Sequence, residues 1–273
     1  MTMSIDFAGI AVVRRAVRAA LEMALPTTCG GCGAPGQTWC AQCERESGQA
    51  TYPGGPRQVR PTPCPLSHPP TWAATPYDGA VRAALVAFKD GDRRDLGTVL
   101  APMLSGAMAE ALGAGPLLGA VLTSGSGPVF VVPVPSSPSA VRRRGDAPLE
   151  LLTRLAVAQT GRSGGDLRVA SVLRLRRRVA DQAGLNHSQR AANLERAMQV
   201  QPRWRAGITG ATCLLTDDVL TTGATLVEAA RALRAGGAGH VAAATVAATE
   251  RRGTPSGGGA RERDALSHFP GWA

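Results

Sequence analysis

The sequence predicts an α/β fold in which helices cover both faces of an open parallel sheet. Two observations indicate this class. Short runs of the 273-residue chain are apolar and largely β-branched without polar alternation, which suits strands that are buried on both faces. These runs alternate with longer segments whose apolar residues recur every three or four positions, as in helices that connect parallel strands. The length allows one to two domains with a sizeable core.

The first predicted elements of the α/β part are two helices. Asp78 can cap a helix that ends at Lys89, because apolar residues follow Asp78 at helical spacing. Residues 96–112 form the second predicted helix. The apolar stretch 99–122 has the length of a membrane span, but an acid, several glycines and a proline interrupt it. A buried helix followed by a loop is therefore the better interpretation.

The later elements alternate between strand and helix. A run rich in β-branched residues predicts the first strand, leucines on one side predict the helix after it, and two adjacent acids end the third strand. An arginine-rich polar stretch, residues 174–196, separates the second and third strands. In chain order the predictions are a strand over 129–135, a helix over 148–158, strands over 167–173 and 212–218, a helix over 224–235 and a strand over 241–247.

The composition changes along the chain and predicts four parts. Residues 1–26 form an amphipathic helix, which docks on the body of the protein or, alternatively, binds a membrane surface. Residues 27–70 hold four grouped cysteines and a proline-rich linker, residues 71–250 form the α/β domain, and residues 251–273 form a flexible tail. Arginines interrupt the N-terminal apolar stretch, which lacks a small-residue cleavage site. We therefore expect a cytoplasmic protein with no transmembrane span.

The charge balance favours anionic partners. The chain has 30 basic and 20 acidic residues, a net charge of +10, and Lys89 is its single lysine. Such an arginine bias resembles compositional drift, so the charge alone is weak evidence for nucleic-acid binding. The aromatic content of 4% argues against a surface of stacking aromatics, and the apolar content of 44% argues against a wholly disordered chain.

Four of the six cysteines form two C-x-x-C pairs, Cys29 with Cys32 and Cys40 with Cys43. Each pair places two thiolates on one tight turn, and nearby glycines permit the close backbone approach that such a turn requires. Two facing turns offer four sulfur ligands in the tetrahedral arrangement that Zn²⁺ accepts, and a closed four-ligand site is structural. A redox dithiol is the alternative, which two pairs at this spacing disfavour.

The segment that carries chemistry, residues 214–226, reads Leu-Leu-Thr-Asp-Asp-Val-Leu-Thr-Thr-Gly-Ala-Thr-Leu. It predicts a buried strand that ends in Asp217 and Asp218, followed by a turn into a helix. Ligands of open α/β sheets bind at the carboxyl ends of the strands, and the first turn of a helix favours phosphate. Carboxylates beside an anion site suit a sugar phosphate, because the acids can accept hydrogen bonds from ribose hydroxyls and favour positive charge on the ring. The alternative is a pair of solvated acids before an ordinary helix start, which the whole string disfavours.

This segment resembles the PRPP-binding signature of type I phosphoribosyltransferases, and the chain as a whole resembles the ComF family of such proteins. The wider resemblance covers most of residues 25–250 and includes the four-cysteine module and the matching spacing of Gln182, Arg190 and Asn193. It implies a Rossmann-like core that binds 5-phosphoribosyl 1-diphosphate (PRPP) with Mg²⁺, together with a small N-terminal zinc module.

The resemblance also assigns roles to single residues. It implies that Asp217 and Asp218 contact the ribose. The chain departs from many relatives after an Arg-Gly element, where it has Asp146. The resemblance assigns the 5′-phosphate to Thr221, Thr222, Gly223, Ala224 and Thr225, and the diphosphate to Pro135, Ser136, Ser137 and Arg144.

Two functions follow from the resemblance. The first is Mg²⁺-dependent transfer of the phosphoribosyl group from PRPP to a nitrogenous base, with release of diphosphate. The alternative is a non-catalytic accessory protein in the uptake of transforming DNA, in which the PRPP pocket is a sensor or docking site. Its partners would be single-stranded DNA or a helicase-like protein. The arginines of residues 174–178 fit either a basic hood over diphosphate or a solvated loop.

Overall fold

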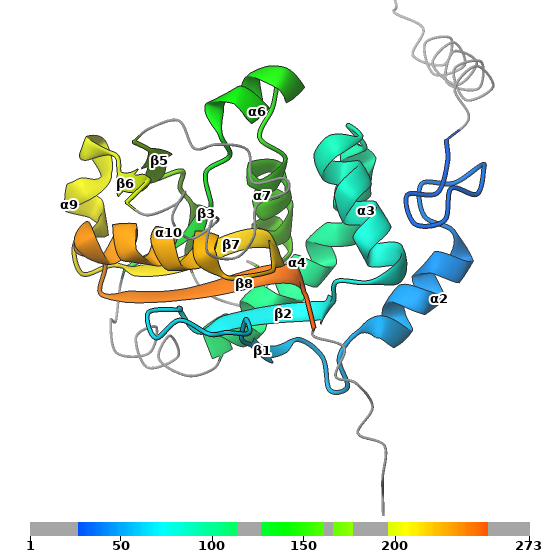
Figure 1. Cartoon of the computed structure of the whole chain (residues 1–273), viewed down its shortest axis with the longest axis horizontal. Coiled ribbons are helices and arrows are strands. Elements are labelled where there is room, and N and C mark those ends of the chain that lie inside the picture. The colour runs from blue at the N-terminus through cyan, green and yellow to red at the C-terminus, as the bar shows by residue number, and fades with distance from the viewer. Residues whose placement is uncertain (1–26, 114–126, 161–165, 177–195, 251–273) are drawn as a thin grey trace, which may run out of the picture.

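The computed structural model describes residues 27–113, 127–160, 166–176 and 196–250. Its main element is a six-stranded sheet with helices on both faces (Figure 1). The strands lie in the order β1-β2-β8-β7-β3-β4, and of these described strands only β1 runs antiparallel to its neighbour. The predicted fold class, a parallel sheet flanked by helices, is confirmed.

The strands of the main sheet are long at its centre and short at its edges. A second, two-stranded sheet pairs two further short strands in antiparallel fashion. The main sheet contains β1 (Arg57–Val59), β2 (Thr71–Pro76), β3 (Val129–Pro133), β4 (Leu167–Val169), β7 (Thr212–Leu220) and β8 (His240–Ala248), and the second contains β5 (Leu173–Leu175) and β6 (Met198–Val200).

Two of the described helices show clear capping residues. Asp78 caps α3 through its side chain, as the sequence predicts, and the left-handed Gly145 follows α6. The described helices are α2 (Ala41–Ala50), α3 (Gly79–Asp90), α4 (Gly97–Gly113), α6 (Pro138–Arg144), α7 (Pro148–Thr160), α9 (Arg205–Ile208) and α10 (Ala224–Ala235), with 3-10 helices η1 (Arg94–Leu96) and η3 (Pro202–Trp204).

The sheet separates two apolar cores. Helices α3, α4 and α7 pack on one face, where Leu104 and Leu214 are fully buried. Helix α10 and the small sheet pack on the other face, where Leu215 and Leu233 are fully buried. Successive residues of β7 thus point to different cores, which explains why the central strands are apolar without alternation.

One helical segment, Arg94–Gly113, is long and apolar enough to cross a membrane by length and composition, with a mean hydropathy of 1.3. In the structure Leu100, Leu104 and Met108 of this segment are fully buried against the sheet and α7. It is therefore a core helix of the α/β layer, in agreement with the predicted buried helix.

The structure differs from the sequence prediction in several elements, and α2, β2, α6, β6 and α9 have no predicted counterpart. The strand predicted over 167–173 divides into β4 and β5. The Ala170 N–H still donates to β3 (3.0 Å), and the Val172 N–H then donates to the Ala170 carbonyl (2.9 Å) in a turn that leads into β5. β7 runs on to Leu220, two residues beyond the predicted end at Asp218. The proline-rich stretch contributes β1, an edge strand that the sequence did not predict.

Some predictions fall outside the described residues. These are the amphipathic helix over 1–26, the tail over 251–273, and the segment 177–195 with Gln182, Arg190 and Asn193.

Candidate functional site

The carboxyl ends of β3 and β7 meet at one edge of the sheet. The two strands are parallel neighbours, with Pro133 opposite Thr216, and the Val134 N–H donates to the Thr216 carbonyl over 3.0 Å. The turn at residues 135–137 therefore starts beside the segment 217–225. Two stretches that the sequence singled out separately thus lie at the same edge of the sheet, where open parallel sheets bind ligands.

The paired aspartates lie near the carboxyl end of β7, followed in the strand only by Val219 and Leu220. Each carboxylate accepts the backbone N–H of the next residue, from Asp218 to Asp217 Oδ1 and from Val219 to Asp218 Oδ1, both over 2.9 Å. These bonds hold the two carboxylates in fixed orientations at the strand end.

The acid pair faces a single ammonium group. Lys89 Nζ, in the last turn of α3, lies 2.6 Å from Asp218 Oδ2. Desolvation and the adjacent Asp218 charge raise the pKa of Asp217 well above its usual range, and Lys89 offsets this only in part. Burial lowers the pKa of Lys89, but the two carboxylates outweigh that effect and raise it overall. One ammonium group therefore lies opposite two carboxyl groups, and the ionised form of Asp217 is the one that the site disfavours.

Lys89 is the residue of this site that sequence reasoning missed. The sequence predicted it only as the end of a helix, and the acids only as ribose contacts. A signal existed, because a chain with 30 basic residues has a lysine at this position alone.

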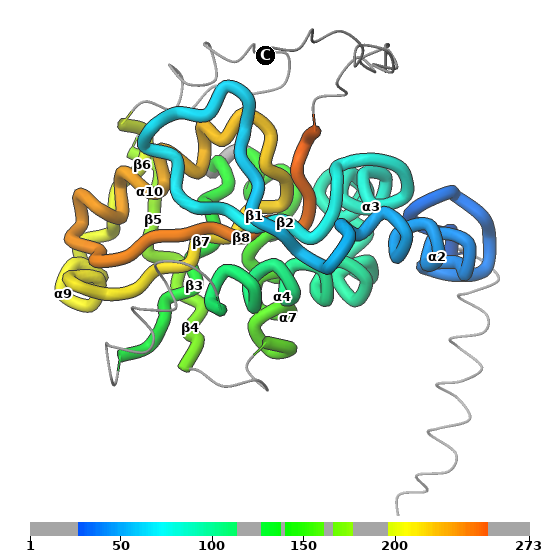
Figure 2. The backbone as a smooth tube through the Cα atoms, turned by 90° about the horizontal axis from the view of Figure 1, so that it is seen from below, coloured from blue at the N-terminus to red at the C-terminus, as the bar shows by residue number. Residues whose placement is uncertain are grey.

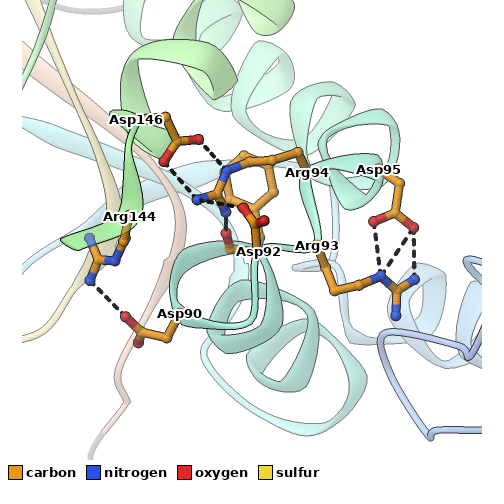
Figure 3. Close-up of polar contacts among 8 residues, drawn as sticks. Asp90, Asp92, Arg93, Arg94, Asp95, Arg144 and Asp146 are labelled. Atoms are coloured by element: carbon orange, nitrogen blue, oxygen red, sulfur yellow. Dashed lines mark hydrogen bonds and ion pairs between the residues drawn. The ribbon is translucent and has the colours of Figure 1, made fainter. Parts of the chain in front are cut away.

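A network of ion pairs fixes the end of α3 that carries Lys89 (Figure 3). Arg94 contacts Asp146 with two nitrogens, Nη2 over 2.8 Å and Nε over 2.5 Å, and also donates to the Phe88 carbonyl. Arg144 Nη2 pairs with Asp90 over 2.7 Å. These pairs join the α3–η1 turn to the loop after α6. One of the partners is Asp146, at which the sequence departs from the ComF pattern that it resembles.

The same network of ion pairs includes Arg144, which the resemblance assigned to diphosphate. Its side chain is only 15% exposed and its guanidinium is engaged by the carboxylate of Asp90. In this structure Arg144 joins two segments at the rim of the site.

The turn after the acids leads into α10. Gly223 stands at the cap position with φ of +73°, a left-handed conformation that favours glycine, and it has no side chain to cap the helix. Thr222 Oγ1 accepts the Ala224 N–H over 3.4 Å. The first N–H groups of a helix lack partners within that helix, so the start of α10 offers donors to an anion. Thr222, Ala224 and Thr225 are half-buried around it and Thr221 is exposed.

The four cysteines of the predicted zinc site converge at the N-terminal side of α2. Their sulfur atoms all lie within 4.8 Å of one another, and Cys32 Sγ and Cys40 Sγ are 3.7 Å apart. Four sulfurs about 2.3 Å from a central Zn²⁺ lie about 3.8 Å from each other, so the spacing fits a tetrahedral site. Backbone N–H groups of Cys40 and Cys43 point at Cys29 and Cys40 sulfurs over 3.4 and 3.5 Å. The cluster is compatible with a structural zinc ion.

Comparison with known proteins supports the fold. No curated protein matches the chain. Residues 168–265 match the family model of the phosphoribosyl transferase domain, and this range contains the paired aspartates and the turn after them. With its mostly parallel sheet and its four-cysteine cluster, the chain therefore has a phosphoribosyltransferase-like fold with an N-terminal cysteine module.

Proposed function

We propose that the chain binds PRPP with Mg²⁺ and transfers its phosphoribosyl group to a nitrogenous base. The observation that carries this proposal is the edge shared by β3 and β7, where two carboxylates, one ammonium and an uncapped helix start lie within or beside the matched domain. A ligand that is anionic at both ends and rich in hydroxyls between them suits this arrangement.

Different residues of the site bind different parts of PRPP. Asp217 and Asp218 accept hydrogen bonds from the ribose hydroxyls, and the turn at residues 221–225 holds the 5′-phosphate with backbone N–H groups and threonine hydroxyls. The turn at residues 135–137 meets the diphosphate. Its position beside β7 supports this role, since the two turns leave the same edge of the sheet.

In the transfer, the bond between C1 of the ribose and the diphosphate oxygen breaks, and diphosphate leaves with the electron pair. A nitrogen of the base forms the new bond to C1 and afterwards loses its proton to solvent. Positive charge develops on the ribose ring while the old bond weakens. The carboxylates of Asp217 and Asp218 stabilise that charge, so positioning and electrostatics supply the catalysis.

The donors present fit Mg²⁺ that binds together with its substrate. Among the described residues the group of three or more potential metal ligands is the four-cysteine cluster, and the acid pair supplies two carboxylates only. Mg²⁺ is usually held by one or two carboxylates, waters and substrate phosphates and not by an all-protein cage. When bound, it neutralises negative charge on the diphosphate. Asp217 and Asp218 would hold it or its waters.

The decisive experiment measures diphosphate release from PRPP over a panel of nucleobases, together with PRPP binding by calorimetry. We expect saturable PRPP binding that needs Mg²⁺, and release above the blank with at least one base. The variant Asp217→Asn/Asp218→Asn should lose affinity while it keeps its circular dichroism spectrum. Absence of PRPP binding by the wild-type chain would refute the proposal.

The same experiment decides between the two predicted functions. PRPP binding without diphosphate release would favour the accessory role in DNA uptake that the ComF resemblance implies. Binding to single-stranded DNA that weakens steeply with salt would then support a phosphate-dominated interface.

We further propose that Cys29, Cys32, Cys40 and Cys43 hold one structural Zn²⁺. The convergence of four sulfurs at tetrahedral spacing supports this occupant, and reduced thiols fit the expected cytoplasmic location. Metal analysis in reducing buffer should find about one zinc per chain, and Cys43→Ala should lose it. Cys64→Ala, at an exposed cysteine outside the cluster, is the matched control and should retain the metal. Zinc-free wild-type protein would refute the proposal.

A further inference from the structure

Residues 60–70, here called the strap, pass beside the turn that begins α10 (Figure 2). A Cβ atom added at Gly223 would lie 2.7 Å from His68 Cδ2, 2.8 Å from His68 Nε2 and 2.9 Å from Pro61 Cγ. The edge of the imidazole that carries Nε2 thus packs directly on the backbone of the turn. The strap is held in place by the Ser67 carbonyl, which accepts a hydrogen bond from Arg234 Nη1 of α10 over 3.2 Å.

Four buried side-chain polar atoms of the described residues lack a hydrogen-bond partner, and one of them, His68 Nε2, packs on this turn. His68 Nε2 is buried and has no hydrogen-bond partner among the described residues. Buried polar side-chain atoms almost always have a partner, so an orphaned nitrogen at a binding turn indicates a missing ligand atom. We propose that His68 is a further phosphate-binding residue, whose Nε2–H donates a hydrogen bond to the phosphoryl group held by the turn at residues 221–225. The inference rests on the proposed function, because that function places a phosphoryl group there.

The charges around His68 decide its protonation. Burial lowers the pKa of His68 to about 4, with a further lowering by the positive charge of Arg60 and an opposing hydrogen bond to the Pro69 backbone. Arg60 lies on the strap itself, and Arg234 approaches the strap from α10 at the neighbouring Ser67. In the free protein the imidazole is therefore neutral at pH 7, with its proton on Nδ1, which faces the Pro69 carbonyl. Nε2 becomes a donor when the ring gains a second proton.

A bound phosphoryl group changes this balance. Its negative charge offsets the positive charges nearby and favours the imidazolium, in which both nitrogens donate. Binding is therefore coupled to the uptake of a proton at His68. Arg60 and Arg234 contribute positive potential to the same corner, which suits a dianion.

The test compares binding by the wild-type chain, His68→Ala and His68→Gln. The probes are PRPP with Mg²⁺, ribose 5-phosphate, and diphosphate with Mg²⁺, which lacks the 5′-phosphate. Calorimetry in buffers of different ionisation enthalpy counts the protons taken up. His240→Gln changes an exposed histidine at the start of β8 and is the matched control. Each variant is titrated with the same three probes, so a difference in affinity from the wild-type chain measures the contribution of the histidine.

We expect His68→Ala to weaken PRPP and ribose 5-phosphate by a similar factor, about tenfold to a hundredfold, since a hydrogen bond to a charged group is lost. His68→Gln keeps a neutral donor and should bind between wild type and His68→Ala, with less proton uptake than wild type. Diphosphate binding and the His240→Gln variant should be unchanged.

The outcomes separate the two proposals. If wild type binds PRPP and ribose 5-phosphate but the His68 variants match it in affinity and proton uptake, the role of His68 is wrong and the proposed function stands. Tighter binding by His68→Ala would show that the imidazole obstructs the turn, and it would overturn the inference. If wild type binds neither sugar phosphate, the proposed function itself fails.

Discussion

Neutralising Asp217 should make the protein more stable and less able to bind its ligand. Asp217→Asn keeps the shape of the side chain, and its amide oxygen can still accept the Asp218 N–H that now lies 2.9 Å from Oδ1. It removes the charge that desolvation and Asp218 both penalise, which is the cause of the raised pKa. A tenfold change in proton affinity corresponds to about 1.4 kcal/mol, so we expect the free energy of unfolding at pH 8 to rise by about 1 kcal/mol or more.

Chemical and thermal unfolding over a pH series measure this effect. The gain should be complete above the raised pKa of Asp217 and should fade as the pH falls toward 3.8, because the wild-type carboxyl is then protonated as well. About 1 kcal/mol corresponds to a rise in Tm of roughly 2–4 °C for a chain of this size. Glu46→Gln, at an exposed acid on α2, changes the net charge equally and should leave Tm unchanged.

The same variant should bind PRPP more weakly, because a ribose hydroxyl loses its charged acceptor. Stability and binding would then change in opposite directions, as expected of a strained functional group. An unchanged or lower Tm at pH 8 would refute the reasoning, since it would show that the ionised carboxylate is not penalised in the fold.

Three further predictions concern neighbouring groups. Lys89→Met should lower Tm at pH 7 by roughly 2–4 °C, because a half-exposed ion pair contributes up to about 1 kcal/mol. The difference in Tm should vanish in acid, where the carboxyl groups are protonated, and well above pH 10.5, where the wild-type lysine is neutral. Equal unfolding curves at pH 7 would contradict this prediction. Gly223→Ala should destabilise more than Gly210→Ala in urea unfolding, because both glycines have positive φ but an added Cβ meets the strap at Gly223 and open space at Gly210. Equal losses would show that the strap does not pack on the turn. Arg94→Met should cost about 1–2 kcal/mol in urea unfolding by breaking the contacts that fix α3, and a change within error would mean that the network is not needed.

The candidate site was only partly predictable from the sequence. The acid pair and the turn after it were recognisable because strand, acids, glycine and helix start follow one another along the chain, and the structure gives them one continuous path from β7 into α10. The four cysteines converge as predicted for the same reason, since two C-x-x-C turns lie close together in the sequence. The roles assigned to the substrate-binding residues remain predictions.

Contacts between distant segments could not be read in this way. Lys89 and Asp218 are separated by 129 positions, and Arg94 and Asp146 by 52. No local pattern relates such residues, because the order of the strands in the sheet decides which loops meet at its edge. The position of the strap could not be predicted either. Its prolines indicated only a linker, because its contact with Gly223 depends on the path of the chain between β1 and β2.

The sequence by itself determined the elements whose signal is local: the long central strands, the capped helices, the cysteine turns and the acid–threonine–glycine segment. Burial on both faces requires apolar strands, and a helix start requires a cap or a glycine. Residues that are neighbours in the sequence therefore suffice to predict these elements. Only the tertiary structure decided the three-residue strands, the partner of each aspartate and the place of His68. Short edge strands have too few residues for a periodic pattern, and charge pairing across the sheet edge depends on topology, which neighbouring residues do not encode.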